Sequence, residues 1–214
     1  MKRILLVPIG ILLFVTSVMT SAAARPQTKP STNADSTAGK TMGSKNAPIT
    51  IEVFSDFQCP ACRAFYEGTL RQLIDNYVST GKVYLIHRDF PLDMHPYSHE
   101  AARLANAAAE IGQFETMERA LFDKQDVWSP TGKIEDAVAP SFSAPQMKRI
   151  HDIATQHAAE LNASIERDRT MGTQRNVNQT PSIYVTAHGK TEALPGGGVS
   201  YPLMKQYLDY LLRQ

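Results

Sequence analysis

The chain has 214 residues, of which 43% are hydrophobic and 20% are charged, and its formal net charge is +1. This composition is ordinary for a globular protein with one hydrophobic core, and the balanced charge gives no indication of nucleic-acid binding. Both cysteines belong to a single motif, so none remains for a second disulfide within the chain and the fold must depend on packing.

The first 24 residues have the three-part pattern of a secretory signal peptide. Lys2 and Arg3 precede an apolar run over residues 4–19, and small residues follow up to Ala24. We expect cleavage after Ala24. The alternative is an uncleaved membrane anchor, because the run is only slightly shorter than a spanning helix. Both outcomes predict a periplasmic or other extracytoplasmic location, where disulfides persist.

Residues 25–45 are rich in Pro, Ser, Thr, Ala, Gly and Lys and show no hydrophobic periodicity. This composition predicts a flexible lead-in. The folded domain is expected to cover residues 46–214.

A predicted strand that runs directly into the cysteine pair is the most informative stretch of the chain. Ile49, Ile51 and Val53 alternate with the residues between them, which is typical of a strand. The cysteines follow at positions 59 and 62, and the apolar spacing over residues 61–78 then predicts a helix that ends before Gly81.

Cys59 is therefore expected at a strand-to-helix junction, where unpaired backbone N–H groups favour an anion such as a thiolate. In this setting the pKa of a cysteine falls from about 8.5 to between about 3.5 and 7.5. Pro60 suits the first helical turn because its missing N–H costs no hydrogen bond there. Cys62, one turn into the helix, is expected to be the resolving thiol in thiol–disulfide exchange.

The rest of the chain predicts a second strand, a helical block and a closing unit. Residues 83–86 form a strand that a right-handed crossover would place parallel to the first. Residues 97–172 show helical spacing, with Ser143 as an N-cap and Trp128 as a packing residue. A hairpin is expected over residues 182–194 and a closing helix over 203–211.

Three segments together resemble the DsbA-like thiol-disulfide oxidoreductases of the thioredoxin superfamily. They are Asn46-Ala47-Pro48, the stretch from Phe54 to Cys62, and Thr180-Pro181 followed by Ile183-Tyr184-Val185. The resemblance covers most of residues 43–214. It implies an α/β thioredoxin fold in which a helical insertion, about residues 97–172, separates the βαβ half from the ββα half.

The resemblance also implies that Pro181 is cis and lies against the cysteine pair, with the backbone just before it pairing with a bound peptide. A trans proline at the start of a strand is the alternative. Thr180, Pro181 and Pro60 are therefore the expected client-binding residues.

Glu52 is a candidate proton relay for Cys62, a role that a strand carboxylate has in the resembled family. The commonest family pattern places its glutamate six residues before the first cysteine, whereas Glu52 lies seven before Cys59. A glutamate that faces solvent or pairs with a lysine is the alternative. Asp56 is expected to be a turn residue at the strand end.

His95 and His99 could in principle complete a zinc site with the two cysteines, but the spacing is far longer than in compact zinc modules. We expect neither a metal nor an organic cofactor.

These features predict an extracytoplasmic thiol-disulfide oxidoreductase that passes the Cys59–Cys62 disulfide to reduced clients. The resemblance implies reoxidation by a quinone-linked membrane partner, DsbB-like or VKOR-like. The residues between the cysteines are Pro60 and Ala61, whereas strong oxidants of the family often carry a histidine there. A reductase or isomerase supplied by a reducing donor, or a client-binding chaperone, are therefore alternatives.

Overall fold

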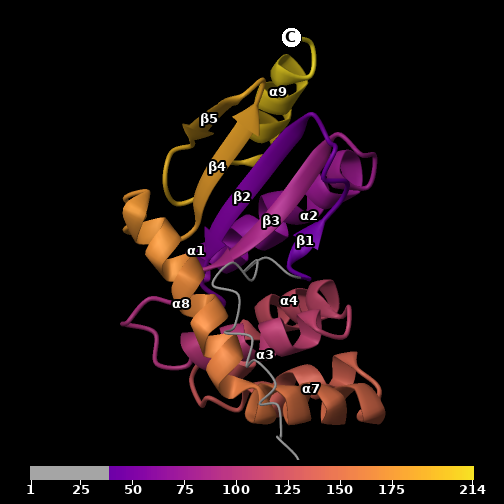
Figure 1. Ribbon diagram of the computed structural model, residues 1–214, viewed down its shortest axis with the longest axis vertical. Helices are drawn as coiled ribbons and strands as arrows, with labels where there is room; N and C mark the ends of the chain where they lie inside the picture. The colour runs from indigo at the N-terminus through magenta and orange to yellow at the C-terminus, as the bar shows by residue number, and fades with distance from the viewer. Residues whose placement is uncertain (1–38) are drawn as a thin grey trace, which may run out of the picture. The chain divides into compact units, whose positions relative to one another are not determined.

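A five-stranded sheet with the order β1-β3-β2-β4-β5 organises the fold of this computed structural model (Figure 1). The structure describes residues 39–214, so the predicted signal peptide and most of the predicted lead-in lie outside the described residues. The strands are β1 (Thr41–Met42), β2 (Ile49–Ser55), β3 (Val83–Asp89), β4 (Ser182–Ala187) and β5 (Lys190–Ala193). The central strand β2 pairs parallel with β3 and antiparallel with β4.

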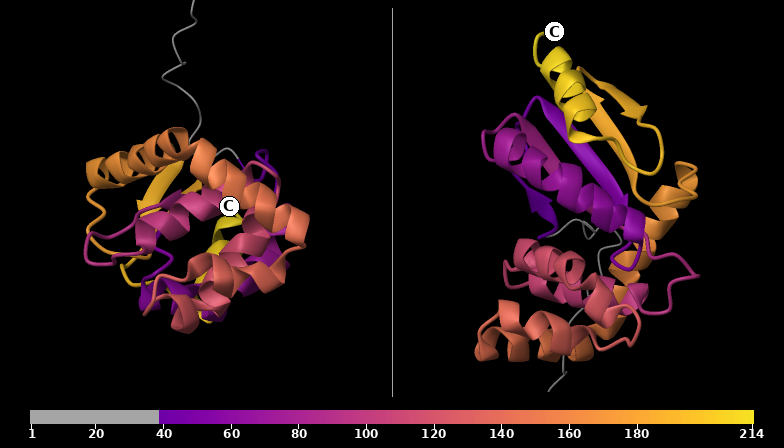
Figure 2. Two further views of the ribbon diagram at one scale, coloured as in Figure 1. Left: turned by 90° about the horizontal axis from the view of Figure 1, so that it is seen from below. Right: turned by 180° about the vertical axis from the view of Figure 1, so that it is seen from behind.

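The crossover from β2 to β3 is one continuous helical segment. It consists of α1 (Pro60–Phe65), η1 (Tyr66–Leu70), α2 (Arg71–Leu73) and η2 (Ile74–Val78), where the η segments are turns of π-helix. Figure 2 shows that this segment and α9 (Tyr201–Leu211) cover the same face of the sheet. Leu73, Met204 and Leu208 bury their apolar side chains there. The predicted parallel strand–helix–strand unit is thus confirmed.

A helical insertion separates the two halves of the sheet, as expected. It comprises α3 (Ser98–Ala109), α4 (Phe114–Asp123), α5 (Gln125–Trp128), α6 (Ile134–Val138), the 3-10 turn η3 (Ala139–Ser141), α7 (Ala144–Gln156) and α8 (Ala158–Gln174). The alanine-rich α3 packs against α4, α7 and α8, because small side chains allow close approach on several sides. Ser143 forms the predicted N-cap, as part of a capping box with Gln146. Trp128 is fully buried and donates from Nε1 to the Leu121 carbonyl at 2.8 Å.

The second half of the sheet is the hairpin β4–β5, which turns at His188 and Gly189. Both residues have positive φ, +50° and +74°, as a tight two-residue hairpin turn requires. The hairpin and the closing helix confirm the predicted ββα half.

The predicted boundary of the flexible lead-in is wrong at its C-terminal end. Lys40 is 1% exposed, and Thr41 and Met42 form β1, which pairs antiparallel with Leu85 and Ile86 of β3. A basic residue in a polar stretch is normally exposed, but Lys40 is buried because two carboxylates pair with its ammonium group. The folded part of the chain therefore begins before Asn46.

Within residues 39–214, none of the helices combines the length and the apolar character that crossing a membrane requires.

Candidate active site

Cys59 lies at the predicted junction, as the N-cap residue of α1. Its backbone is extended, with φ −74° and ψ 122°, and Pro60 begins the helix. The helix therefore starts immediately beyond the sulfur, with its free N–H groups directed toward it. Both cysteines are reduced, and Cys59 is 7% exposed whereas Cys62 is 1% exposed. Cys59 is thus the more exposed cysteine of the pair.

The environment of Cys59 favours the thiolate. A hydrogen bond from the Cys62 thiol makes the largest contribution, and it outweighs the opposing effect of burial. The Thr180 side chain and the backbone N–H groups of Cys62 and Ala61 contribute in the same direction, and together they lower the pKa of Cys59 to about 5. Cys59 is therefore ionised at neutral pH.

Cys62 has the opposite environment. Its burial, together with the hydrogen bond to Cys59 and the charge of the Cys59 thiolate, raises the pKa of Cys62 well above its usual value. The Asp56 N–H donates to Cys62 Sγ at 3.4 Å. The pair thus consists of an ionised nucleophile, Cys59, and a protonated partner, Cys62, whose S–H donates a hydrogen bond to the Cys59 thiolate.

Pro181 lies at the start of β4, and the peptide bond between Thr180 and Pro181 is cis. Cys59 Sγ lies 3.5 Å from the Thr180 carbonyl oxygen, which accepts a hydrogen bond from Cys59 in its protonated form, so the residue before Pro181 contacts the reactive sulfur directly. Thr180 Oγ1 is buried and has no hydrogen-bond partner among residues 39–214, so this hydroxyl is available to the Cys59 thiolate. The structure brings together Cys59, Cys62, Pro60 and the Thr180-Pro181 pair.

Asp56 does more than end the strand, because its carboxylate organises the loop ahead of Cys59. It accepts hydrogen bonds from the N–H groups of Gln58 (2.7 Å) and Leu92 (2.9 Å), from the Ser98 hydroxyl, and contacts His95 Nδ1 at 2.7 Å. The sequence predicts only a turn role for Asp56, because partners up to 42 positions away leave no local pattern.

The structure does not bring Glu52 to Cys62, which corrects the expected relay. Successive side chains of a strand point to opposite faces, and Val53 lies in the same buried cluster as the cysteines. Phe54 lies in a second cluster, with Phe90 and Val177, and Glu52 shares its face. Glu52 instead pairs with Arg88 at 2.7 Å and Arg175 at 2.7 Å. The predicted alternative of a solvent-facing or lysine-paired glutamate is not observed either, because Glu52 is buried and its partners are arginines.

Replacing Glu52 by glutamine is expected to leave the pH dependence of Cys59 alkylation unchanged while lowering stability by about 2 kcal/mol, because two arginines lose the carboxylate to which both are hydrogen-bonded. Denaturant unfolding and alkylation rates measured on one preparation check both parts. Glu67→Gln, which breaks an exposed pair with Arg63, is the control and should cost less than about 1 kcal/mol. A shifted pH profile of Cys59 alkylation in Glu52→Gln would instead support Glu52 as the proton relay.

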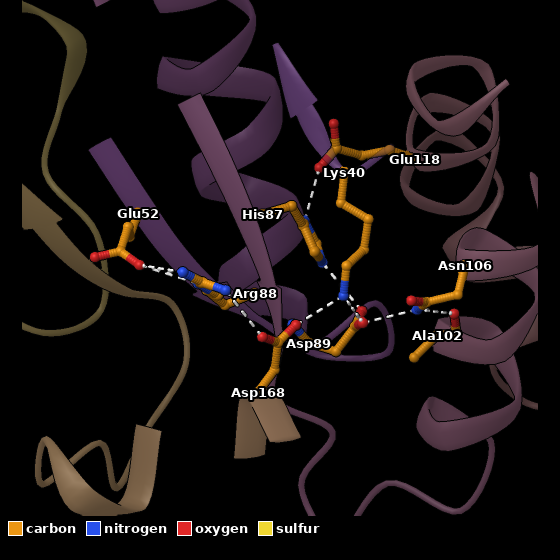
Figure 3. Close-up of polar contacts among 9 residues, drawn as sticks. All are labelled: Lys40, Glu52, His87, Arg88, Asp89, Ala102, Asn106, Glu118 and Asp168. Carbon is orange, nitrogen blue, oxygen red and sulfur yellow. Dashed lines mark hydrogen bonds and ion pairs between the residues drawn. The ribbon is translucent and has the colours of Figure 1, made fainter. Parts of the chain in front are cut away.

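Glu52 is one end of a buried chain of alternating charges between the sheet and the insertion (Figure 3). Arg88 links Glu52 to Asp168, with 3.2 Å between Arg88 Nη1 and Asp168 Oδ1. Lys40 Nζ then bridges Asp168, at 2.7 Å, and Asp89. His87 continues the chain, because it lies 3.4 Å from Asp89 Oδ1 and 3.0 Å from Glu118 Oε1. This buried charge chain, from Glu52 to Glu118, joins β2, β3, α4, α8 and the N-terminal segment.

The buried charge chain predicts a pH dependence of stability through His87. Burial alone would lower the pKa of His87, but its bonds with Asp89 and Glu118 outweigh burial and raise the pKa from 6.5 to about 9. A raised pKa stabilises the fold fully below the unfolded value, and this contribution is lost as pH rises through the folded value. Between pH 6.5 and 9 the oxidised protein should therefore lose about 2–3 kcal/mol of unfolding free energy.

The oxidised form is the one to titrate, because ionisation of Cys59 stabilises the reduced form as pH rises through the same range. His87→Gln, measured alongside by denaturant unfolding, should remove this slope. Equal slopes in the two proteins would contradict the assignment.

His95 and His99 do not lie at the sulfur atoms. His95 contacts Asp56, and His99 Nε2 lies 3.6 Å from Glu166 Oε1. Among residues 39–214, no three His, Cys, Asp or Glu side chains are arranged to hold a metal ion.

A Cys-X-X-Cys pair at the start of the first helix, facing a cis-proline at the start of a strand, defines a thioredoxin-fold protein with a reactive cysteine. The family model described as thioredoxin matches residues 35–195. The chain belongs to the thioredoxin family.

Relatives and solved structures are consistent with this assignment. The crystal structure of Wolbachia pipientis alpha-DsbA1 superimposes with a TM-score of 0.66 at 19% identity, over 80% of this chain and 89% of that chain. Bacillus anthracis probable disulfide bond formation protein D is 24% identical over 157 residues, which cover 70% of each chain.

The chain is also similar to part of a much longer protein. It is 31% identical over 146 residues to the Na(+)/H(+) antiporter NhaA 3 of Salinispora tropica. The match covers 67% of this chain and 21% of the antiporter, so the chain spans about a fifth of that relative's length.

Proposed function

We propose that this chain is an extracytoplasmic thiol-disulfide oxidoreductase that oxidises pairs of cysteines in client proteins. The observation that carries the proposal is the contrast within one cysteine pair: Cys59 is the more exposed cysteine and its pKa is lowered to about 5, whereas Cys62 is fully buried and its pKa is raised. The name of the Bacillus anthracis relative, a disulfide bond formation protein, agrees with this direction.

The reaction follows from this contrast. A client thiolate attacks Cys59 Sγ of the Cys59–Cys62 disulfide, which forms a mixed disulfide and releases Cys62 as a thiolate that takes up a proton. The second client thiolate then attacks the client sulfur, and Cys59 leaves as a thiolate. The client dithiol is oxidised by two electrons, and the cysteine pair is reduced by the same two.

The stabilised thiolate is the reason to prefer oxidation over reduction. Interactions that lower the pKa of Cys59 stabilise the reduced form and not the disulfide, so they make the disulfide a stronger oxidant. No histidine is present between the cysteines, but the Cys62 thiol, Thr180 and two backbone N–H groups supply the stabilisation.

A groove beside the cysteines supports the binding of an extended client segment. It has a volume of about 530 Å³ and is lined on one side by Ala64 and Phe65, and on the other by Val199 and Tyr201. Gly198 keeps the loop close to the helix, because its φ is +92° and a Cβ atom there would lie 2.9 Å from the Phe65 ring. A client cysteine at Cys59 would place its neighbouring residues along this groove and beside Thr180-Pro181.

The proposal requires a partner that reoxidises the dithiol, for which a quinone-linked membrane protein, DsbB-like or VKOR-like, is the proposed class. It also requires an oxidising compartment, which the signal-like N-terminal sequence supports.

The test is the equilibrium of the Cys59–Cys62 disulfide with a series of glutathione mixtures at pH 7, followed by thiol trapping. Mildly reducing mixtures should reduce the disulfide, giving a potential well above the thioredoxin value of about −270 mV. A pair that stays oxidised until strongly reducing conditions would overturn the proposal in favour of a reductase supplied by an electron donor.

A further inference from the structure

Gln125, which no motif identified, makes an unusual pair of contacts with the active-site loop. It is the first residue of α5 and is 4% exposed. Its Nε2 donates to the carbonyl of Phe57 at 2.7 Å and to the carbonyl of Cys59 at 3.1 Å. A side-chain amide carries two hydrogens on its nitrogen, so this single group can satisfy both carbonyls. The contact connects the helical insertion to the loop that carries the reactive cysteine.

The contact fixes the backbone on the C-terminal side of Cys59. The peptide plane before Cys59 is held because its N–H donates to the Asp56 carbonyl at 3.1 Å. The plane after Cys59 is held because its carbonyl accepts from Gln125 and from the N–H of Arg63, at 3.2 Å. Holding both planes sets φ and ψ of Cys59, and these two angles determine how Cβ, which carries Sγ, is placed relative to the N–H groups at the start of α1.

We infer that Gln125 is a positioning residue for thiol–disulfide exchange, which orients Cys59 by bridging the carbonyls of Phe57 and Cys59. The inference rests on the proposed function, because it concerns the reactivity of the same sulfur. Gln125 does not touch the sulfur and acts only through the backbone. Its removal should therefore change the reactivity of Cys59 more than it changes the fold.

Gln125→Met is the substitution that tests this role. Methionine has nearly the length of glutamine and no donor, so Gln125→Met removes both hydrogen bonds and keeps the volume. Two buried carbonyls then lack this donor, and the Cys59 carbonyl keeps only Arg63. The freed loop allows Sγ to move away from the N–H groups that stabilise its thiolate.

The experiment measures the alkylation rate of Cys59 against pH in reduced wild-type protein and in Gln125→Met. We expect the midpoint of the variant to rise by about one pH unit, which corresponds to an approximately tenfold lower rate at pH values below both midpoints. The potential of the pair against glutathione should become less oxidising in the same variant. A loss of stability alone would move neither quantity.

Gln146→Met is the matched control, because it removes a glutamine that caps α7 and has no contact with the active-site loop. It should lower stability by about 1 kcal/mol and leave the midpoint unchanged. If Gln125→Met does not fold, Gln125→Asn withdraws the amide by one methylene and should shift the midpoint in the same direction. A folded Gln125 variant with the wild-type midpoint, or an equal shift in Gln146→Met, would overturn the inference.

The two proposals fail separately. The wild-type midpoint and potential test the proposed function, whereas the difference between variant and wild type tests the role of Gln125.

Discussion

Replacing Cys62 by serine is expected to trap Cys59 in a covalent mixed disulfide with a model client whose single cysteine carries a glutathione disulfide. The Cys59 thiolate of the reduced variant attacks the client sulfur, and glutathione leaves as a thiolate. In the wild type, Cys62 Sγ then attacks Cys59 Sγ and releases the client thiol, and an intramolecular thiol has an effective concentration that external thiols cannot match. Release of the client should therefore be slower by at least about 1000-fold in the variant. Non-reducing electrophoresis, followed over time, measures the trapped species.

Cys59→Ser is an informative control, because the two cysteines differ in exposure and in pKa. Cys59→Ser retains only the cysteine that is 1% exposed and has a raised pKa, so it should neither trap a client nor react rapidly with an alkylating reagent. Equal trapping by the two variants would contradict the assignment of Cys59 as the nucleophile.

Lys40→Met is expected to have the largest effect on stability, about 3–5 kcal/mol. Lys40 Nζ pairs with Asp89 and Asp168, and the side chains of all three residues are fully buried. Removing the cation leaves two buried carboxylates close together, and breaking a buried ion pair by deleting one partner typically costs this much. Urea unfolding of the oxidised protein gives the free energy directly.

The matched control is Lys205→Met, which breaks the exposed pair with Asp209 and should change stability by less than about 1 kcal/mol. A second comparison measures the coupling between Lys40 and Asp89: Asp89→Asn combined with Lys40→Met should lose less stability than the sum of the single variants, because the two residues are direct partners. A loss below about 1 kcal/mol in Lys40→Met would contradict the account of Lys40 as the buried cation that pairs with Asp89 and Asp168.

The parts of the fold that the sequence predicted are those with a local signal. Alternation over Ile49–Val53 predicted β2, and the turn from strand to helix at Cys59 followed from Pro60 and the helical spacing after it. Alanine-rich and capped segments predicted the insertion in the same way. Each of these patterns depends on residues only a few positions apart.

The parts that were missed depend on partners far apart in the chain. Lys40 lies in a polar stretch, and its partners are 49 and 128 positions away. β1 has two residues, which is too short for a period to be recognised. Gln125 contacts carbonyls 66 and 68 positions away, and a glutamine at the start of a short helix has no distinguishing pattern. The relay role of Glu52 was predicted from its distance to Cys59 along the chain. Strand alternation, however, directs its side chain to the face of β2 opposite the cysteines.

The most direct test of the central claim is the pH dependence of Cys59 alkylation in the reduced wild-type protein. The environment of Cys59 predicts a midpoint at about pH 5, with full reactivity of the thiolate at neutral pH. A midpoint near the ordinary thiol value of about 8.5 would show that the start of α1, the Cys62 thiol and Thr180 do not stabilise the thiolate, and the proposed oxidant would lose its physical basis.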